Sequence, residues 1–238
     1  MIDANEKSSI IRMFHVHHNY GAKRALIDIT LDIAKNEFIY ISGPSGAGKT
    51  TLLKLFYLSE WVSEGQILID GLNLSRIPHK RIPFLRRKFG IIFQDYKLIP
   101  HRTVYENIAL VLEAAGKHRR LMQKKVKSVL RLVKMEDRYN AFPASLSGGE
   151  QQRVAVARAV VGDPQIVLAD EPTGSLDADS AEVIMDLLRG VYVKGATIII
   201  ATHDSKMIRK TGGRVLFLKK GRLEGSAFVE KQHDDAIV

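Results

Sequence analysis

Apolar residues recur along the chain with two different periods, which predict strands and helices in alternation. Near the N-terminus, Ile29, Leu31 and Ile33 alternate with polar residues, as in a strand with one buried face. Later apolar runs are continuous, which is typical of strands that are buried on both faces. These runs lie at 38–41, 90–93, 166–169, 197–201 and 215–218.

Helical spacing fills stretches between these runs. Apolar residues recur there at intervals of three and four, so that each helix has one apolar face. The residues concerned lie at 52–56, 126–133 and 184–191. Doubly buried strands that alternate with helices predict an α/β fold with a mainly parallel sheet.

Turn signals complete the expected organisation. Asp70-Gly71 predicts a tight turn between two antiparallel strands, and Lys220-Gly221 predicts a terminal hairpin. We expect one domain in which a helical subdomain is inserted into the α/β core, beside an antiparallel β subdomain. The expected bounds are an N-terminal extension at 1–9, the domain at 10–225 with its helical subdomain at about 95–150, and a flexible tail at 226–238.

Composition indicates a globular protein without disulfides or thiolate metal sites, because the chain has no cysteine. No apolar run reaches the roughly 18–20 residues that span a bilayer. The first ten residues contain acidic side chains and no apolar segment of the kind found in secretory signals. We therefore expect a cytosolic protein.

The chain is basic, with a net charge of 36 − 26 = +10. Much of the excess lies in two clusters, at 80–88 and 117–127. Solvated surface is the simplest interpretation, and contact with anionic lipid or a partner protein is the better functional alternative. Neither cluster has interleaved aromatic residues that stack on bases, so we expect no nucleic-acid partner.

A glycine-rich segment between a strand and a helix carries the first chemical signal. Residues 43–50 match the pattern G-x-x-x-x-G-K-[ST], in which backbone N–H groups surround phosphate oxygens. Lys49 is expected to reach the β- and γ-phosphates, and the Thr50 hydroxyl to bind Mg²⁺. The expected phosphate-binding residues are Gly43, Pro44, Ser45, Gly46, Ala47, Gly48, Lys49, Thr50 and Thr51.

Two adjacent carboxylates end the apolar run at 166–169. Asp170 is placed to hold Mg²⁺, directly or through water. Glu171 points elsewhere and is available as the general base that polarises the attacking water. Taken alone, the pair is better explained as a strand followed by a solvated turn. Together with the phosphate loop, the catalytic interpretation becomes the better one.

A second glycine pair begins another predicted helix. Ser147 and Glu150 have the spacing of a capping box, which would explain both without any ligand. Capping does not require Gly148 and Gly149, however, and these suit a helix start that approaches an anion closely. Such a start makes sense if it contacts the γ-phosphate of ATP held by another subunit.

The run Leu-Ser-Gly-Gly-Glu-Gln-Gln-Arg at 146–153 resembles the signature of ABC ATPases, and the other family motifs follow in order over about 10–225. This resemblance implies a P-loop ATPase core that hydrolyses ATP with Mg²⁺. It also implies an ATP-dependent homodimer in which each site is completed by Ser147, Gly149 and Glu150 of the neighbour.

The same resemblance implies roles for four further positions. Tyr20 resembles the aromatic residue that stacks on adenine, and Gln94 the glutamine near Mg²⁺ and the attacking water. Residues 175–177, which end in Asp177, resemble the loop that links the two sites of a dimer. His203 resembles the switch histidine that contacts the γ-phosphate. His15, His17 and His18 match no family position, and we expect strand residues there, with metal binding as the weaker alternative.

Within this family, residues 93–98 and 102–108 resemble the bacterial cell-division ATPases of the FtsE family. That resemblance implies an FtsX-like integral membrane partner, regulation of cell-wall hydrolysis, and a peripheral location on the cytoplasmic face of the inner membrane. Pro44 and the long N-terminal extension depart from the usual FtsE pattern.

Two alternatives stay open at this stage. The chain could serve a lipoprotein-release or efflux transporter, whose ATPases differ only moderately over the same residues. It could instead be a soluble ABC protein acting on ribosomes or DNA, although such proteins usually have two tandem ATPase units or a long coiled-coil insertion, and the sequence shows neither. A P-loop kinase is disfavoured because it would give 147–150 no function.

Overall fold

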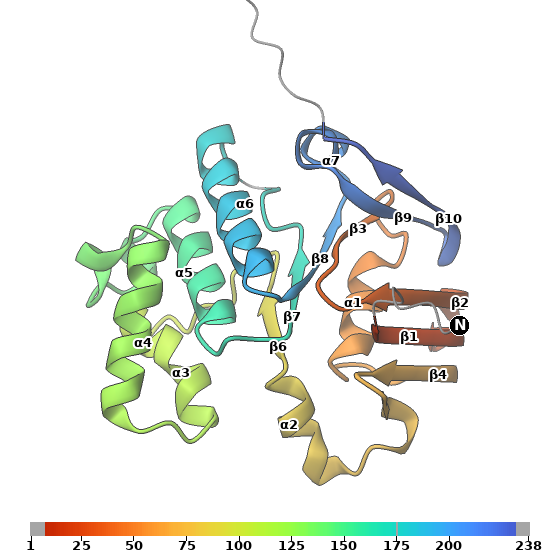
Figure 1. Ribbon diagram of the computed structural model, residues 1–238, viewed down its shortest axis with the longest axis horizontal. Coiled ribbons are helices and arrows are strands. Elements are labelled where there is room, and N and C mark those ends of the chain that lie inside the picture. The colour runs from red at the N-terminus through yellow and green to blue at the C-terminus, as the bar shows by residue number, and fades with distance from the viewer. Residues whose placement is uncertain (1–7, 175, 232–238) are drawn as a thin grey trace, which may run out of the picture. The chain divides into compact units, whose positions relative to one another are not determined.

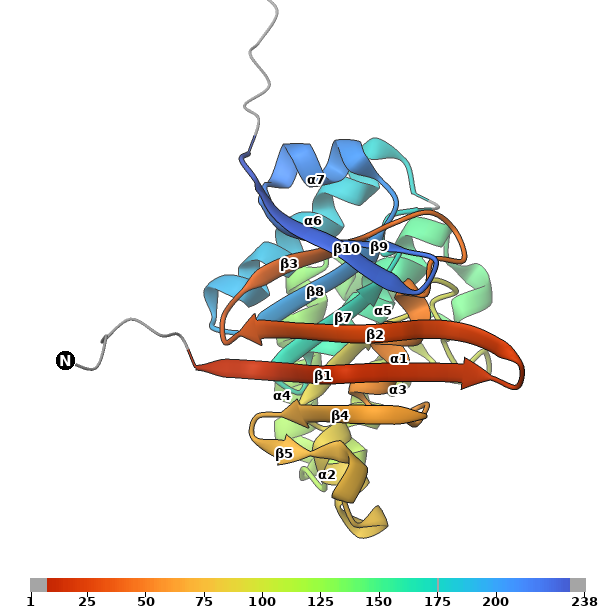
Figure 2. The same ribbon diagram turned by 90° about the vertical axis from the view of Figure 1, so that its right-hand side faces the viewer.

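The computed structural model describes residues 8–174 and 176–231 (Figures 1 and 2). The chain divides into two compact units, each described by itself below. The first unit consists of 1–86 and 199–238, and the second of 87–198. None of the helices in the described ranges is both long and apolar enough to cross a bilayer.

The first unit contains an antiparallel sheet with the strand order β2-β1-β4-β5 (Figure 2). Its strands are β1 (Ser9–Tyr20), β2 (Lys23–Ala34), β4 (Glu64–Ile69) and β5 (Leu72–Asn73). The predicted alternation is confirmed, because Ile29, Leu31 and Ile33 are buried while Thr30 and Asp32 are exposed. β1 and β2 are longer than the short strands expected, since their pairing runs from Ser9↔Ala34 to Tyr20↔Lys23.

The same unit contains strands with the order β10-β9-β3-β8. β3 (Phe38–Ser42) pairs in parallel with β9 (Gly213–Lys219), and β9 pairs antiparallel with β10 (Arg222–Val229). β8 (Thr197–Thr202) belongs to this unit from Ile199 onward and is buried throughout. Helix α1 (Lys49–Phe56) follows β3, while α2 (Ile82–Arg86) and the unpredicted α7 (Ser205–Thr211) are short.

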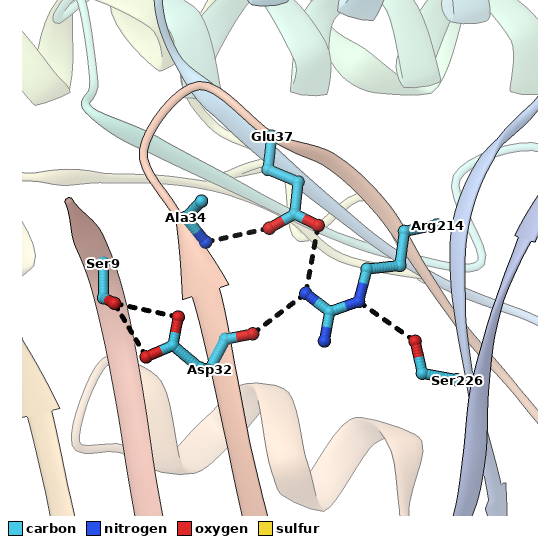
Figure 3. Close-up of polar contacts among 6 residues, drawn as sticks. All are labelled: Ser9, Asp32, Ala34, Glu37, Arg214 and Ser226. Atoms are coloured by element: carbon cyan, nitrogen blue, oxygen red, sulfur yellow. Dashed lines mark hydrogen bonds and ion pairs between the residues drawn. The ribbon is translucent and has the colours of Figure 1, made fainter. Parts of the chain in front are cut away.

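Our expectation of a flexible tail from residue 226 is wrong for 226–229. β10 continues to Val229, which pairs with Gly213 of β9. The Arg214 Nε–H donates to Ser226 Oγ at 3.0 Å, and its Nη1 donates to Asp32 O and Glu37 Oε1 (Figure 3). Backbone pairing and the Arg214 guanidinium hold this end of β10, so its sequence needs no apolar pattern and gave none to predict it from.

The second unit combines a parallel strand pair with helices (Figure 1). β6 (Phe89–Ile92) pairs in parallel with β7 (Ile166–Asp170). The helices are α3 (Val104–Ala114), α4 (Arg119–Leu132), α5 (Gly148–Val160) and α6 (Ala178–Val193). As the periodicity predicted, the apolar face of α4 lies in the core that α3 and α5 share; it consists of Val126, Val129, Leu130 and, just beyond the helix, Val133.

A buried amide organises the turn before α3. Asn107 is fully buried, and its side-chain oxygen accepts from the Ile99 N–H at 2.7 Å. Its amide nitrogen lies 2.9 Å from Arg102 O, 3.0 Å from Thr103 O and 3.1 Å from Ile99 O. One side chain therefore adds hydrogen bonds to four backbone groups of 99–103 and fixes this turn before α3.

Asn107→Ala should lower the free energy of unfolding by about 1–3 kcal/mol, because the Ile99 N–H would lose its acceptor and the turn carbonyls would lose the Asn107 amide nitrogen. Urea denaturation followed by circular dichroism measures the change. Asn140→Ala, on the exposed surface of the same unit, is the control and should stay within about 0.5 kcal/mol of the parent. Equal losses in both variants would contradict this account of Asn107.

Candidate nucleotide site

The phosphate loop lies between β3 and α1, as the sequence predicted. Gly46 and Gly48 have φ values of 75° and 107°, a left-handed region that glycine adopts without strain. The Lys49 ammonium is buried with the side chain and donates to Gly43 O at 2.8 Å and Pro44 O at 3.3 Å. The lysine thus folds back over the loop, with its charge where phosphate oxygens would approach.

Two of the loop glycines are required by close backbone packing. A Cβ atom at Gly43 would lie 2.0 Å from the carbonyl oxygen of Leu218 in β9. A Cβ atom at Gly48 would lie 2.8 Å from Ala25 O and 2.9 Å from the Leu26 side chain in β2. The loop therefore gets its shape from both sheets of the first unit, and the exposed Thr50 follows it at the start of α1.

Two other predicted site residues lie at strand ends of this unit. Tyr20 ends β1 with 42% of its side chain exposed, and its ring lies edge-on to His18 with 4.6 Å between centroids. His18 is buried, and because a carbonyl only accepts, its Nδ1–H donates to Trp61 O at 2.8 Å. His203 follows β8 and precedes Asp204, the N-cap of α7.

The predicted catalytic carboxylates end β7 in the second unit. Asp170 is the last residue of the strand, and Glu171 has a φ of 46°. A non-glycine residue is strained in this left-handed region, and residues strained in this way cluster at functional sites. A turn then returns the chain, with the Gly174 N–H donating to Glu171 O at 3.3 Å.

The capping box predicted at 147–150 is present at the start of α5. Ser147 Oγ accepts from the Glu150 N–H at 3.2 Å, and Glu150 Oε2 accepts from the Ser147 N–H at 2.8 Å. That second hydrogen bond, helped by Arg138, lowers the pKa of Glu150 below its ordinary value. Ser147 and Gly148 are exposed, so this helix start is open to a partner.

Neighbouring segments are tied to α5. The Gln152 side chain is buried and donates to Pro172 O at 2.6 Å, directly after Glu171. Asp177 is the N-cap of α6 and accepts from the Ser180 N–H at 2.8 Å, which lowers its pKa. A Cβ atom at Gly149 would lie 3.0 Å from Ser180 Oγ. Ser175 lies outside the described residues.

Each unit therefore holds part of the predicted site. The first contains Tyr20, the phosphate loop and His203, and the second contains Gln94, Ser147–Glu150, Asp170, Glu171 and Asp177. Gln94 is exposed and follows β6 by two residues. Sequence reasoning did not single out Gln152 or Arg158, although the signal existed: both are polar residues on the buried face of α5.

Protein ligands alone do not form a metal cage in the parts of the chain that the structure describes, where no group of three or more His, Asp or Glu side chains has suitable geometry. His15 instead pairs with Asp28 at 2.7 Å, and His18 is used as described above. Thr50, Asp170 and Gln94 all offer oxygen atoms. This donor chemistry fits Mg²⁺, which takes few protein ligands and binds substrate phosphates.

A sequence profile of the ABC transporter family matches residues 26–174. That range contains the phosphate loop, Gln94, the capped start of α5 and the two carboxylates. The chain belongs to the ABC transporter family. Its predicted P-loop α/β fold and its class, an ABC-type ATP hydrolase, are thereby confirmed, and solved relatives have the same fold.

Comparison with curated proteins shows which members of the ABC transporter family this chain resembles. The chain is 44% identical to the cell division ATP-binding protein FtsE of Streptococcus pneumoniae, over 90% of this chain and 94% of that protein. It is 43% identical to the FtsE proteins of Bacillus subtilis, over 89% and 93%, and Escherichia coli, over 91% and 98%. The resemblance to the FtsE family is confirmed.

A solved structure gives the same answer for the fold. The ATP-binding cassette MJ0796, determined as a dimer in a post-hydrolysis state bound to ADP and Pi, is 34% identical and superposes with a TM-score of 0.84. The match covers 93% of this chain and 100% of that chain.

The Glu150 charge should stabilise the protein in a pH-dependent way. Because the folded-state pKa is lowered, its contribution is present above the ordinary value of 4.5 and is lost as the pH falls through the lowered pKa. Glu150→Gln keeps the capping geometry and removes the charge, so its melting temperature should be below that of the parent at pH 7 and approach it below pH 4.5. Thermal melts from pH 7 to pH 3, with the exposed Glu136→Gln as control, measure this. A deficit independent of pH would disprove the charge effect.

Proposed function

We propose that this chain is the ATPase subunit of an FtsE-type membrane complex in cell division. The observation that carries the proposal is its 43–44% identity to FtsE proteins of three bacteria over about nine-tenths of the chain. The absence of a membrane-crossing helix from the described residues is compatible with a subunit that attaches peripherally through a partner.

Nucleotide binding is assigned to the first unit. The loop N–H groups between Gly43 and Thr50 and the ammonium of Lys49 hold the phosphates, and the exposed face of Tyr20 stacks on adenine. Thr50 of this unit, and Asp170 and Gln94 of the other, would each offer an oxygen ligand to Mg²⁺, which would supply positive charge to neutralise the phosphates. Lys49, already folded over its own loop, needs only a small movement to exchange carbonyl partners for phosphate oxygens.

Hydrolysis is assigned to carboxylate and amide groups of the second unit. Glu171 accepts a proton from the attacking water, and Gln94 orients that water. His203 contacts the γ-phosphate. The left-handed φ of Glu171 supports this assignment, because strained backbone conformations cluster at active sites.

The active form is proposed to be a homodimer with two ATP molecules between its subunits. Ser147, Gly149 and Glu150 of one subunit contact the γ-phosphate held by the other, where the N-terminus of α5 favours negative charge. Asp177, at the N-terminus of α6, links the two sites. The dimeric MJ0796 cassette supports this arrangement. Each ATP molecule then contacts both subunits and stabilises the dimer, and hydrolysis weakens the dimer because it removes the shared γ-phosphate.

The partner is proposed to be an FtsX-like integral membrane protein through which the dimer regulates cell-wall hydrolysis. Transport by a lipoprotein-release or efflux complex is the second candidate, supported by the description of MJ0796 as an ABC transporter cassette. Affinity purification from native membranes separates the two: an FtsX-like protein supports the first, and a substrate-translocating permease supports the second.

Glu171→Gln should bind MgATP, hydrolyse it about 10²–10⁴ times more slowly than the parent, and accumulate as a dimer. The general base is lost while the phosphate contacts remain. Phosphate release measures the rate, and light scattering after size-exclusion chromatography measures the dimer. Glu113→Gln, an exposed change on α3, is the control. Rapid turnover by Glu171→Gln would refute the role of Glu171.

A further inference from the structure

Arg158 lies on α5 and is buried, with 9% of its surface exposed. Its neighbours along the helix, Ala157 and Ala159, are also buried. Arg158 makes no salt bridge within the described ranges, and burial lowers its pKa. A buried guanidinium needs hydrogen-bond acceptors in fixed positions, because an uncompensated buried charge is strongly unfavourable.

Its acceptors are two consecutive backbone carbonyls just after Gln94. Nη1–H donates to Lys97 O and Nη2–H donates to Tyr96 O, both at 2.6 Å. Tyr96 and Lys97 have φ values of 56° and 47°, an unfavourable conformation for residues with a side chain. The planar fork of arginine matches two adjacent acceptors, which a single ammonium does not. Arg158 therefore fixes a strained turn two residues from Gln94.

The same turn reaches the start of α5. A Cβ atom at Gly148 would lie 3.2 Å from the Tyr96 hydroxyl, so this hydroxyl lies beside the first residue of the helix. Arg158 is eleven residues beyond Ser147, or about 16 Å along the helix axis. The turn thus touches α5 near both ends, at the exposed start and at the buried guanidinium.

We propose that Arg158 is a positioning residue for ATP hydrolysis: it couples the 96–97 turn, and with it Gln94, to the helix whose start contacts the second subunit. A shift of Ser147–Glu150 moves α5 as a rigid element, and the guanidinium carries Gln94 with it. Gln152 links the same helix to Pro172 after Glu171, so both hydrolysis residues follow α5. This inference rests on the proposed role of Gln94.

The test is a double-mutant cycle between Arg158→Lys and Gln94→Ala in the full-length protein. Lysine keeps the charge but loses the fork, so kcat should fall about 10-fold or more while KM for MgATP changes less than about threefold. In the Gln94→Ala background the same change should alter kcat less than about twofold. Arg131→Lys, on the exposed surface of α4, should change neither constant.

A purely structural role gives a different result. Arg158→Lys would then lower kcat by equal factors in both backgrounds, in proportion to the loss of folded protein measured by thermal melting, and the proposal would be overturned. Lys97→Pro provides a second variant if Arg158→Lys does not fold. Proline cannot adopt the φ of 47° at this exposed residue, so it displaces the turn without emptying the core.

Lys97→Pro should lower kcat in the parent and have little effect in the Gln94→Ala background, and an equal effect in both backgrounds would overturn the proposal.

Failure of the proposed function would give a different result: the parent would then not hydrolyse MgATP, or Gln94→Ala would not lower kcat. In that event amide exchange at Tyr96 and Lys97 decides whether Arg158 holds the turn. If Arg158 holds the turn, Arg158→Lys should speed exchange at these two amides alone. Unchanged exchange would show that Arg158 does not hold the turn.

Discussion

Buried polar side chains on α5 hold together the functional segments of the second unit. Arg158 binds two carbonyls after Gln94, and Gln152 binds the carbonyl after Glu171. Apolar contacts are non-directional and do not by themselves fix individual backbone atoms. The hydrogen bonds to the carbonyls of Tyr96, Lys97 and Pro172 do. Besides packing in the core, α5 therefore positions the segments next to Gln94 and Glu171, and its own first turn is capped at Ser147.

Glycine and non-glycine residues reach left-handed conformations here for different reasons. Gly46 and Gly48 adopt positive φ without strain, so the left-handed conformations of the phosphate loop need no support from outside, although its packing against β9 and β2 requires glycine at 43 and 48. Glu171, Tyr96 and Lys97 adopt such conformations against their own preference and depend on their surroundings. The binding loop is therefore free of this strain, whereas the segments assigned to hydrolysis are held in strained conformations by tertiary contacts. Such segments respond to displacements of those contacts.

The sequence predicted the features that depend on local signals. Periodicity located the strands and the apolar face of α4, and residue spacing located the phosphate loop and the capping box at Ser147 and Glu150. It did not predict that β10 reaches Val229, because backbone pairing and Arg214 hold that strand while Phe228 stays 75% exposed. Nor did it assign Arg158, since the acceptors lie some sixty positions away and only the fold brings them together.

The residues predicted for nucleotide binding and those predicted for hydrolysis fall largely in different units. Residues proposed to bind the nucleotide (Tyr20, the phosphate loop and His203) belong to the unit built on the antiparallel sheet and β3. Those proposed to act on water or on a second subunit belong to the unit that contains α5. Gln94 and Glu171 lie next to segments that α5 holds by hydrogen bonds to backbone carbonyls. Since the start of the same helix is proposed to contact the neighbouring subunit, the proposed mechanism couples dimer formation to hydrolysis through this one element.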